Sequence, residues 1–307
     1  MSWLNGFELL CYCITALSIV SFIRRKDSKA LFAFGTGALV GFTMELLAVK
    51  FAGQYHYNTA FWLAIGARPN QFPVFGGLMW GILISYSIKI AQKFRFRKFM
   101  KALVAGFLIV TMDLFLDVVA IRLDGGFWAW EGQPINLAVN AQAFMGVSWI
   151  NFLGYMVMAP AVAWLILRSW DIVGDSNLKK QALYMLLNFI SGVAIAGAGN
   201  VLNLLLNQLT NSVSSFVLFV IVWVALAVLV AQRTLRARFR CLHAKDWNWP
   251  MFLFWMANYL YSLVAILHLK IQLTHLWYFI FGILAMLITA FFCLSEPIGA
   301  AAEGAGN

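Results

Sequence analysis

The feature that most constrains this chain is a succession of long apolar runs, each able to cross a lipid bilayer as a helix. Each run is roughly 20 residues long, the length that a membrane-spanning α-helix needs. A membrane β-barrel would show short segments of alternating polarity instead. The runs cover residues 4–23, 30–51, 72–92, 102–122, 147–167, 182–206, 212–232, 250–269 and 275–294.

Composition favours the same fold class. Hydrophobic residues make up 63% of the 307 residues and charged residues 11%, whereas soluble domains have about 45–50% and about 25%. We predict an all-α polytopic membrane bundle of about nine transmembrane helices, with eight as the lower limit. It forms one domain over residues 1–295, followed by a disordered tail at 296–307. The first run has no basic flank or small-residue cleavage site, which indicates a retained helix rather than a signal peptide.

Basic residues predict the orientation. They gather in alternate connections, at residues 24–29, 93–101 and 233–240, with a weaker group at 168–180, while the intervening connections carry few cations. By the positive-inside rule, the N-terminus lies outside and the C-terminus in the cytoplasm. The net charge of +10 therefore indicates loops that face anionic membrane lipid, and not nucleic-acid binding. We expect an integral protein of a bacterial cytoplasmic membrane, and the sequence leaves the oligomeric state open.

Polar residues divide the chain into two halves. We assign the intramembrane acids to residues 1–168, whereas the runs within residues 169–295 carry amides at Asn188, Asn200, Asn203 and Asn258. Close helix packing with polar contacts accounts for the amides. The acids need another explanation.

Asp113 and Asp117 are four residues apart within an apolar run, so they share one helix face, and Asp124 continues that stripe about two turns on. Glu45 is expected at a similar depth on the second run. An acid within a spanning helix costs about 2.5–3.5 kcal/mol, and more if it faces lipid. We therefore expect these side chains to face a protein interior or a wet cavity. A buried pair that only hydrogen-bonds neighbouring helices is the structural alternative, but a milder residue such as Ser or Asn would suffice for that.

Such a cavity suits one kind of chemistry. A carboxyl group in an apolar site retains its proton because burial disfavours the anion, and a second carboxylate nearby strengthens this effect. The neutral acid can protonate an alkene, and aromatic faces can stabilise the resulting carbocation. A water activated by the remaining carboxylate could then add to the cation. Without water, an internal double bond could close a ring.

Four segments occur in an order that resembles a known family. They are Glu45 followed by a Gly-Gln-Tyr-His-Tyr stretch at 53–57, Pro73 with Trp80, Asp-Leu-Phe-Leu-Asp at 113–117 ahead of Phe127, Trp128 and Trp130, and the segment 146–155 with Asn151. Over about residues 40–160, the chain resembles the carotenoid-biosynthesis membrane proteins that include the carotenoid 1,2-hydratases and bisanhydrobacterioruberin hydratase. It departs from that pattern at Val118 and Ser148, where Pro is usual, and at Tyr155, where Trp is usual.

The resemblance implies a hydro-lyase that hydrates a terminal C=C bond of an acyclic carotenoid or related polyene through a tertiary carbocation. It implies catalytic roles for Asp113, Asp117 and Glu45. Substrate binding would fall to Tyr55, Tyr57, Trp80, Trp128, Trp130, Trp149 and Asn151. No cofactor or metal is expected, because the four cysteines and four histidines are scattered.

Three other functions remain open at this point. A membrane terpene cyclase would use the same protonation but end in a ring. An intramembrane prenyltransferase would use an Asp-x-x-x-Asp motif for Mg²⁺ and diphosphate, but a second acidic motif is missing from the sequence. A transporter or assembly protein could use the carboxylate pair as a proton relay without any lipid chemistry.

Overall fold

The computed structural model describes residues 2–53, 55–173 and 177–298. Within them, nine helices are long and apolar enough to cross a membrane, so the predicted fold class is confirmed. The helices are α1 (Trp3–Arg24), α2 (Ser28–Leu47), α3 (Val74–Ala91), α4 (Lys98–Ala120), α5 (Trp149–Val173), α6 (Leu178–Leu209), α7 (Val213–Ala237), α8 (Trp249–His268) and α9 (Leu276–Leu294).

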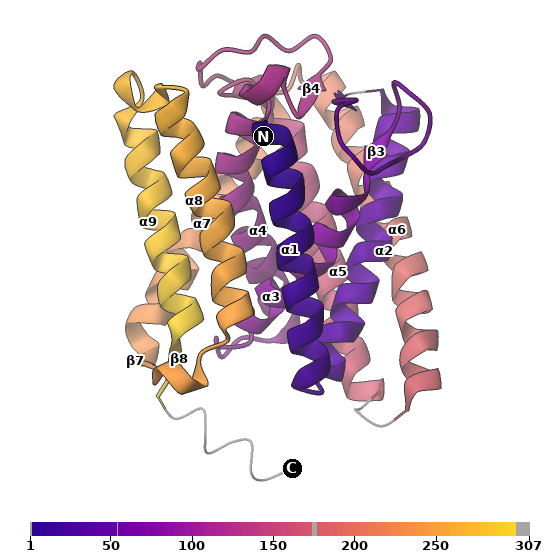
Figure 1. The fold of residues 1–307 in the computed structure, drawn as a ribbon, viewed down its shortest axis with the longest axis vertical. Coiled ribbons are helices and arrows are strands. Elements are labelled where there is room, and N and C mark those ends of the chain that lie inside the picture. The colour runs from indigo at the N-terminus through magenta and orange to yellow at the C-terminus, as the bar shows by residue number, and fades with distance from the viewer. Residues whose placement is uncertain (1, 54, 174–176, 299–307) are drawn as a thin grey trace.

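The helices stand side by side along the long axis of the molecule, and α1 begins at the end of the bundle opposite to the one at which α9 ends (Figure 1). Helix α4 is central: it contacts α3, α5, α7, α8 and α9, and almost all of its residues from Ala102 onward are buried. Helices α6 and α7 are at the other extreme, with few buried residues and long exposed apolar faces. Such faces fit lipid rather than water.

Close packing of α2 against α3 depends on glycines, of which Gly41 and Gly77 are the most crowded. A Cβ atom on Gly41 would lie 2.3 Å from the Cβ of Trp80, and one on Gly77 would lie 2.3 Å from the ring of Phe42. The absence of side chains at these positions lets the helices approach so closely, and Gly37 and Gly81 are crowded at the same contact. Glu45 is one helical turn beyond Gly41, so this contact also fixes Trp80 beside Glu45.

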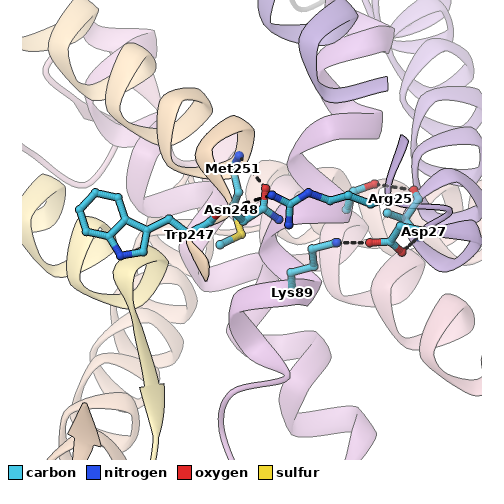
Figure 2. A network of polar contacts seen from close by, with 8 residues as sticks. Arg25, Asp27, Lys89, Trp247, Asn248 and Met251 are labelled. Carbon is cyan, nitrogen blue, oxygen red and sulfur yellow. Dashed lines mark hydrogen bonds and ion pairs between the residues drawn. The ribbon is translucent and has the colours of Figure 1, made fainter. Parts of the chain in front are cut away.

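Polar contacts link the ends of four helices, α1, α2, α3 and α8 (Figure 2). Asp27 forms an ion pair with Lys89 of α3, and Arg25 donates to the carbonyl of Trp247 at 3.3 Å. The side chain of Asn248 accepts from the backbone N–H of Met251 at 3.3 Å and so caps α8. The α1–α2 turn is thereby tied to α3 and to the start of α8.

The connections contain four two-stranded sheets and four short helical turns. The paired strands are β1 (Tyr55–Tyr57) with β4 (Trp128–Trp130), β2 (Ala64–Ile65) with β3 (Phe72–Pro73), β5 (Ala143–Phe144) with β6 (Val147–Ser148), and β7 (Phe239–Cys241) with β8 (Ser295–Pro297). The turns are η1 (Ala48–Ala52), which is π-helical, η2 (Leu123–Gly125), η3 (Ala244–Asp246) and η4 (Ile271–Leu273).

The structure corrects two expectations about where elements end. Glu296 and Pro297, predicted to begin a disordered tail, instead lie in β8, where Glu296 accepts two hydrogen bonds from Arg240; residues 299–307 of that tail lie outside the described part. The prediction that Asp124 extends the aspartate stripe is wrong, because α4 ends at Ala120 and Asp124 adopts a φ of 50° in η2. Its carboxylate accepts from the backbone N–H of Leu4 at 2.7 Å and caps α1.

Candidate active site

The bundle brings Glu45, Asp113 and Asp117, hereafter the three acids, to one buried cavity. Their exposed fractions are 5%, 6% and 2%, so they face the protein interior and not lipid. The cavity, hereafter the acid cavity, has a volume of about 80 Å³ and is walled by α2, α3, α4 and α5 and by strands β1 and β4. Because these strands lie near the N-terminal end of the bundle, the cavity lies toward that end (Figure 1).

Asn151 joins the two aspartates. Its amide nitrogen lies 2.5 Å from Oδ2 of Asp117 and 3.4 Å from Oδ2 of Asp113. The helical spacing of the aspartates stacks them on one face of α4. One amide from α5 therefore holds both groups in place, with the closer contact to Asp117.

Glu45 has a different environment, because four donors converge on it. The hydroxyl of Tyr55 donates to Oε2, as does that of Tyr57 at 3.1 Å. The indole N–H of Trp80 donates to Oε1 at 3.2 Å, and the hydroxyl of Tyr155 does so at 3.5 Å. An ionised carboxylate has about four acceptor sites and no donor, so this ring of donors matches the charged form.

Strands β1 and β4 position the aromatic residues. Tyr55 pairs with Trp130 and Tyr57 with Trp128, and alternate residues of a strand point to the same side. These four side chains therefore line the acid cavity together, while His56 points to the outer side and contacts Glu131 at 2.8 Å. Burial and the nearby Glu45 carboxylate raise the pKa of Tyr55 and Tyr57, so both phenols remain protonated donors.

Nine of the ten predicted site residues line this cavity, and Trp149 does not. Its ring packs against Phe216 and Phe219 of α7, and its indole N–H donates to the carbonyl of Asn140 at 2.7 Å. Trp149 and Asn151 are two residues apart on a helix, so they point in directions that differ by roughly 200°. Trp149 therefore stabilises the α5–α7 contact and has no place at the cavity.

Sequence reasoning missed two residues that matter here. Tyr155 lies one turn after Asn151 on the same face of α5, a spacing that could have revealed it. Glu8 is a fourth intramembrane acid, fully buried on α1. It accepts from the backbone N–H groups of Trp62 and Leu63 at 2.8 and 3.0 Å, and therefore holds a loop rather than lining the acid cavity. Over the described residues, no group of three or more His, Cys, Asp or Glu side chains could hold a metal ion.

Comparison with known proteins assigns the family. No curated protein and no solved structure matches the chain. A family model described as "Carotenoid biosynthesis protein" matches residues 6–222, which span more than half of the chain and include every residue that lines the acid cavity. The protein therefore belongs to the carotenoid biosynthesis protein family.

Proposed function

We propose that this membrane protein is a hydratase that adds water to a terminal C=C bond of an acyclic carotenoid or related polyene. Its family places it in carotenoid metabolism, which supplies the substrate class. The observation that carries the proposal is that the three acids receive different numbers of hydrogen bonds. Glu45 receives four donors, whereas the two aspartates share the single amide of Asn151.

The unequal contacts suggest where the proton resides. A hydrogen bond to a carboxylate favours its charged form, and Asn151 is closer to Asp117 than to Asp113 by 0.9 Å (3.4 − 2.5). We assign one proton to the pair and place it on Asp113. Two buried carboxylates that share one amide partner cannot both ionise readily, which gives a neutral acid near a base.

The reaction then follows in two balanced steps. Asp113 donates its proton to the less substituted carbon of the terminal double bond, which leaves a tertiary carbocation on the other carbon. A water molecule attacks the cation and loses one proton to the Asp117 carboxylate. The pair again holds one proton, and the net change is the addition of one water across the double bond.

The rest of the cavity suits this intermediate. The rings of Tyr55, Tyr57, Trp80, Trp128 and Trp130 present aromatic faces and edges that stabilise a cation without forming a bond to it. The Glu45 carboxylate adds a fixed negative charge on α2, across the cavity from the aspartates. Each water needs about 30 Å³, so a cavity of about 80 Å³ has room for the reacting chain end or about two waters.

Product mass tests the proposal. In a host that accumulates an acyclic carotene, the wild-type protein should yield a product heavier by one water. Asp113→Asn and Asp117→Asn should each lower product formation by about 10²- to 10⁴-fold, the range for a lost general acid or base. Asp246→Asn, at an exposed position in η3, is the control and should retain full activity.

Other results would reject the assignment. A new product with the mass of the starting carotene would indicate cyclisation. Full activity in both aspartate variants would remove the acid pair from the mechanism. Proton flux in liposomes without any change in the polyene would indicate a proton relay instead.

A further inference from the structure

A second, larger cavity adjoins the acid cavity. Its volume is about 400 Å³, and it lies between α2, α5 and α6. The two cavities share five wall residues, which are Glu45, Tyr55, Trp130, Asn151 and Tyr155. The larger space, hereafter the side cavity, is therefore separated from the aspartates only by side chains of the proposed active site.

The side cavity exists because α2 and α6 diverge along their length. Lower in the bundle they are tightly packed: a Cβ atom on Gly35 would lie 2.5 Å from the sulfur of Met185, and one on Gly192 would lie 3.0 Å from Val40. Near the level of Glu45 the contact ends, because a Cβ atom on Gly197 would meet nothing within 4 Å. The two helices lie at the right-hand edge of the bundle in Figure 1, and residues of both line the side cavity.

The rim of the side cavity is apolar and exposed. Phe51 is 73% exposed, Val201 58% and Leu47 39%. Phe51 belongs to η1, a π-helical turn that follows α2 directly, and such turns occur often at functional sites in proteins. In a membrane-spanning bundle, an outward apolar rim at helix level meets lipid chains and not water.

We propose that the side cavity is a lateral passage by which a polyene chain enters from the bilayer and in which its unreacted part lies during the reaction. This inference rests on the proposed function. The acid cavity is smaller than a cavity of about 150 Å³ that holds benzene, so it admits only the end of a chain. Cavities of about 300–1,000 Å³ hold drug-sized ligands, so the side cavity takes the next portion and the remainder extends into the bilayer.

Most polar side chains of the side cavity lie at its boundary with the acid cavity. Asn151, Tyr155 and Glu45 form the boundary with the acid cavity, whereas Met44, Ala48 and Met158 are among the apolar wall residues. An apolar chain can therefore lie in the side cavity without removing any carboxyl group from its hydrogen-bonding partners. Asn200 keeps its own partner in the carbonyl of Ala196 at 3.0 Å.

Gly197 offers a direct test, because a side chain there would enter open space. Gly197→Phe should fill the passage without displacing a helix, whereas Ala198→Phe, at an exposed position next to it and outside the cavity wall, is the matched control. We expect Gly197→Phe to raise the KM for the polyene by about tenfold or more with little change in kcat, as expected when substrate binding alone is lost. Equal kinetics in the two variants would reject the passage and leave the hydratase proposal intact.

A binding measurement separates the two proposals. Protein carrying Asp113→Asn should be purified in lipid nanodiscs with lycopene, and the retained polyene measured by absorbance. We expect retention by Asp113→Asn and by its combination with Ala198→Phe, and about tenfold less in combination with Gly197→Phe. Retention unaffected by Gly197→Phe overturns the passage even if hydration fails.

A small substitution excludes a folding defect. Gly197→Cys, in a background with the exposed Cys13 and Cys241 replaced by Ser, should remain active until a bulky thiol reagent is attached by a disulfide. Reduction should then restore activity. Activity that is unchanged after complete labelling would contradict the passage.

Discussion

The amide nitrogen of Asn151 lies 2.5 Å from Oδ2 of Asp117 and ties α5 to the centre of α4. Asp117 is the ionised member of the pair in the proposed mechanism, and a hydrogen bond to a charged acceptor is stronger than a neutral one. It fixes the position of one carboxyl group of the pair, and the longer contact leaves Asp113 less constrained, as the proposed proton transfer to a substrate requires.

We predict that Asn151→Leu lowers the rate of hydration by about 10²-fold, the effect of misplacing a catalytic group by roughly 1 Å. The folded protein should persist, because the aspartates can still share a proton between them. Product formation per folded protein is the measurement, with Asn203→Leu as control. Asn203 donates to the carbonyl of Ile150 at 3.3 Å and accepts from Ser215, so its loss should lower stability and spare the rate.

Much of the fold was predictable because bilayer thickness imposes a length on every apolar run. The three acids were predictable because a carboxyl group in such a run costs free energy to insert, which indicates a specific structural or catalytic role. Glu8 satisfies the same criterion and was overlooked. Its contacts show that a buried acid can also serve to accept hydrogen bonds from backbone N–H groups of a connecting loop.

The aromatic wall was only partly predictable. Tyr55 and Trp130 are far apart in the sequence, and their pairing in strands of three residues depends on where α2 and α4 place the connections. No local pattern specifies such a contact. Trp149 was misassigned for a related reason: sequence proximity to Asn151 does not reveal which side of α5 faces the cavity. A helical wheel drawn from Asn151 would have selected Tyr155 in its place.

We predict that Glu45→Gln lowers both stability and activity. The amide retains one oxygen and turns its NH₂ group toward donors, so at least one of the four donors loses its acceptor. A buried donor without a partner costs about 1–3 kcal/mol, and loss of the negative charge removes stabilisation of the carbocation. Thermal unfolding in nanodiscs and product formation per folded protein measure the two effects.

Glu8→Gln is the matched comparison. It removes one acceptor from the loop N–H groups of Trp62 and Leu63 and should cost a similar free energy of about 1–3 kcal/mol. Since Glu8 does not line the acid cavity, activity per folded protein should be unchanged. If the two variants lose stability and activity in the same proportions, Glu45 has only a structural role.

We predict that Gly41→Ala disturbs the site through packing alone. Its new methyl group would meet the Cβ and ring of Trp80 at 2.3–2.7 Å, too close for any relaxed contact, so α2 and α3 must separate or the indole must move. Overpacking of this kind costs about 1–3 kcal/mol, and it would also break the hydrogen bond from Trp80 to Glu45.

The control is Gly6→Ala on α1, where a Cβ atom meets nothing within 4 Å. The gain of helix propensity there should leave the stability equal or raise it by about 0.5–1 kcal/mol. Thermal unfolding of both variants, with tryptophan fluorescence as a second signal, measures the effect, and equal stability of the two would show that the α2–α3 contact is looser than the structure describes.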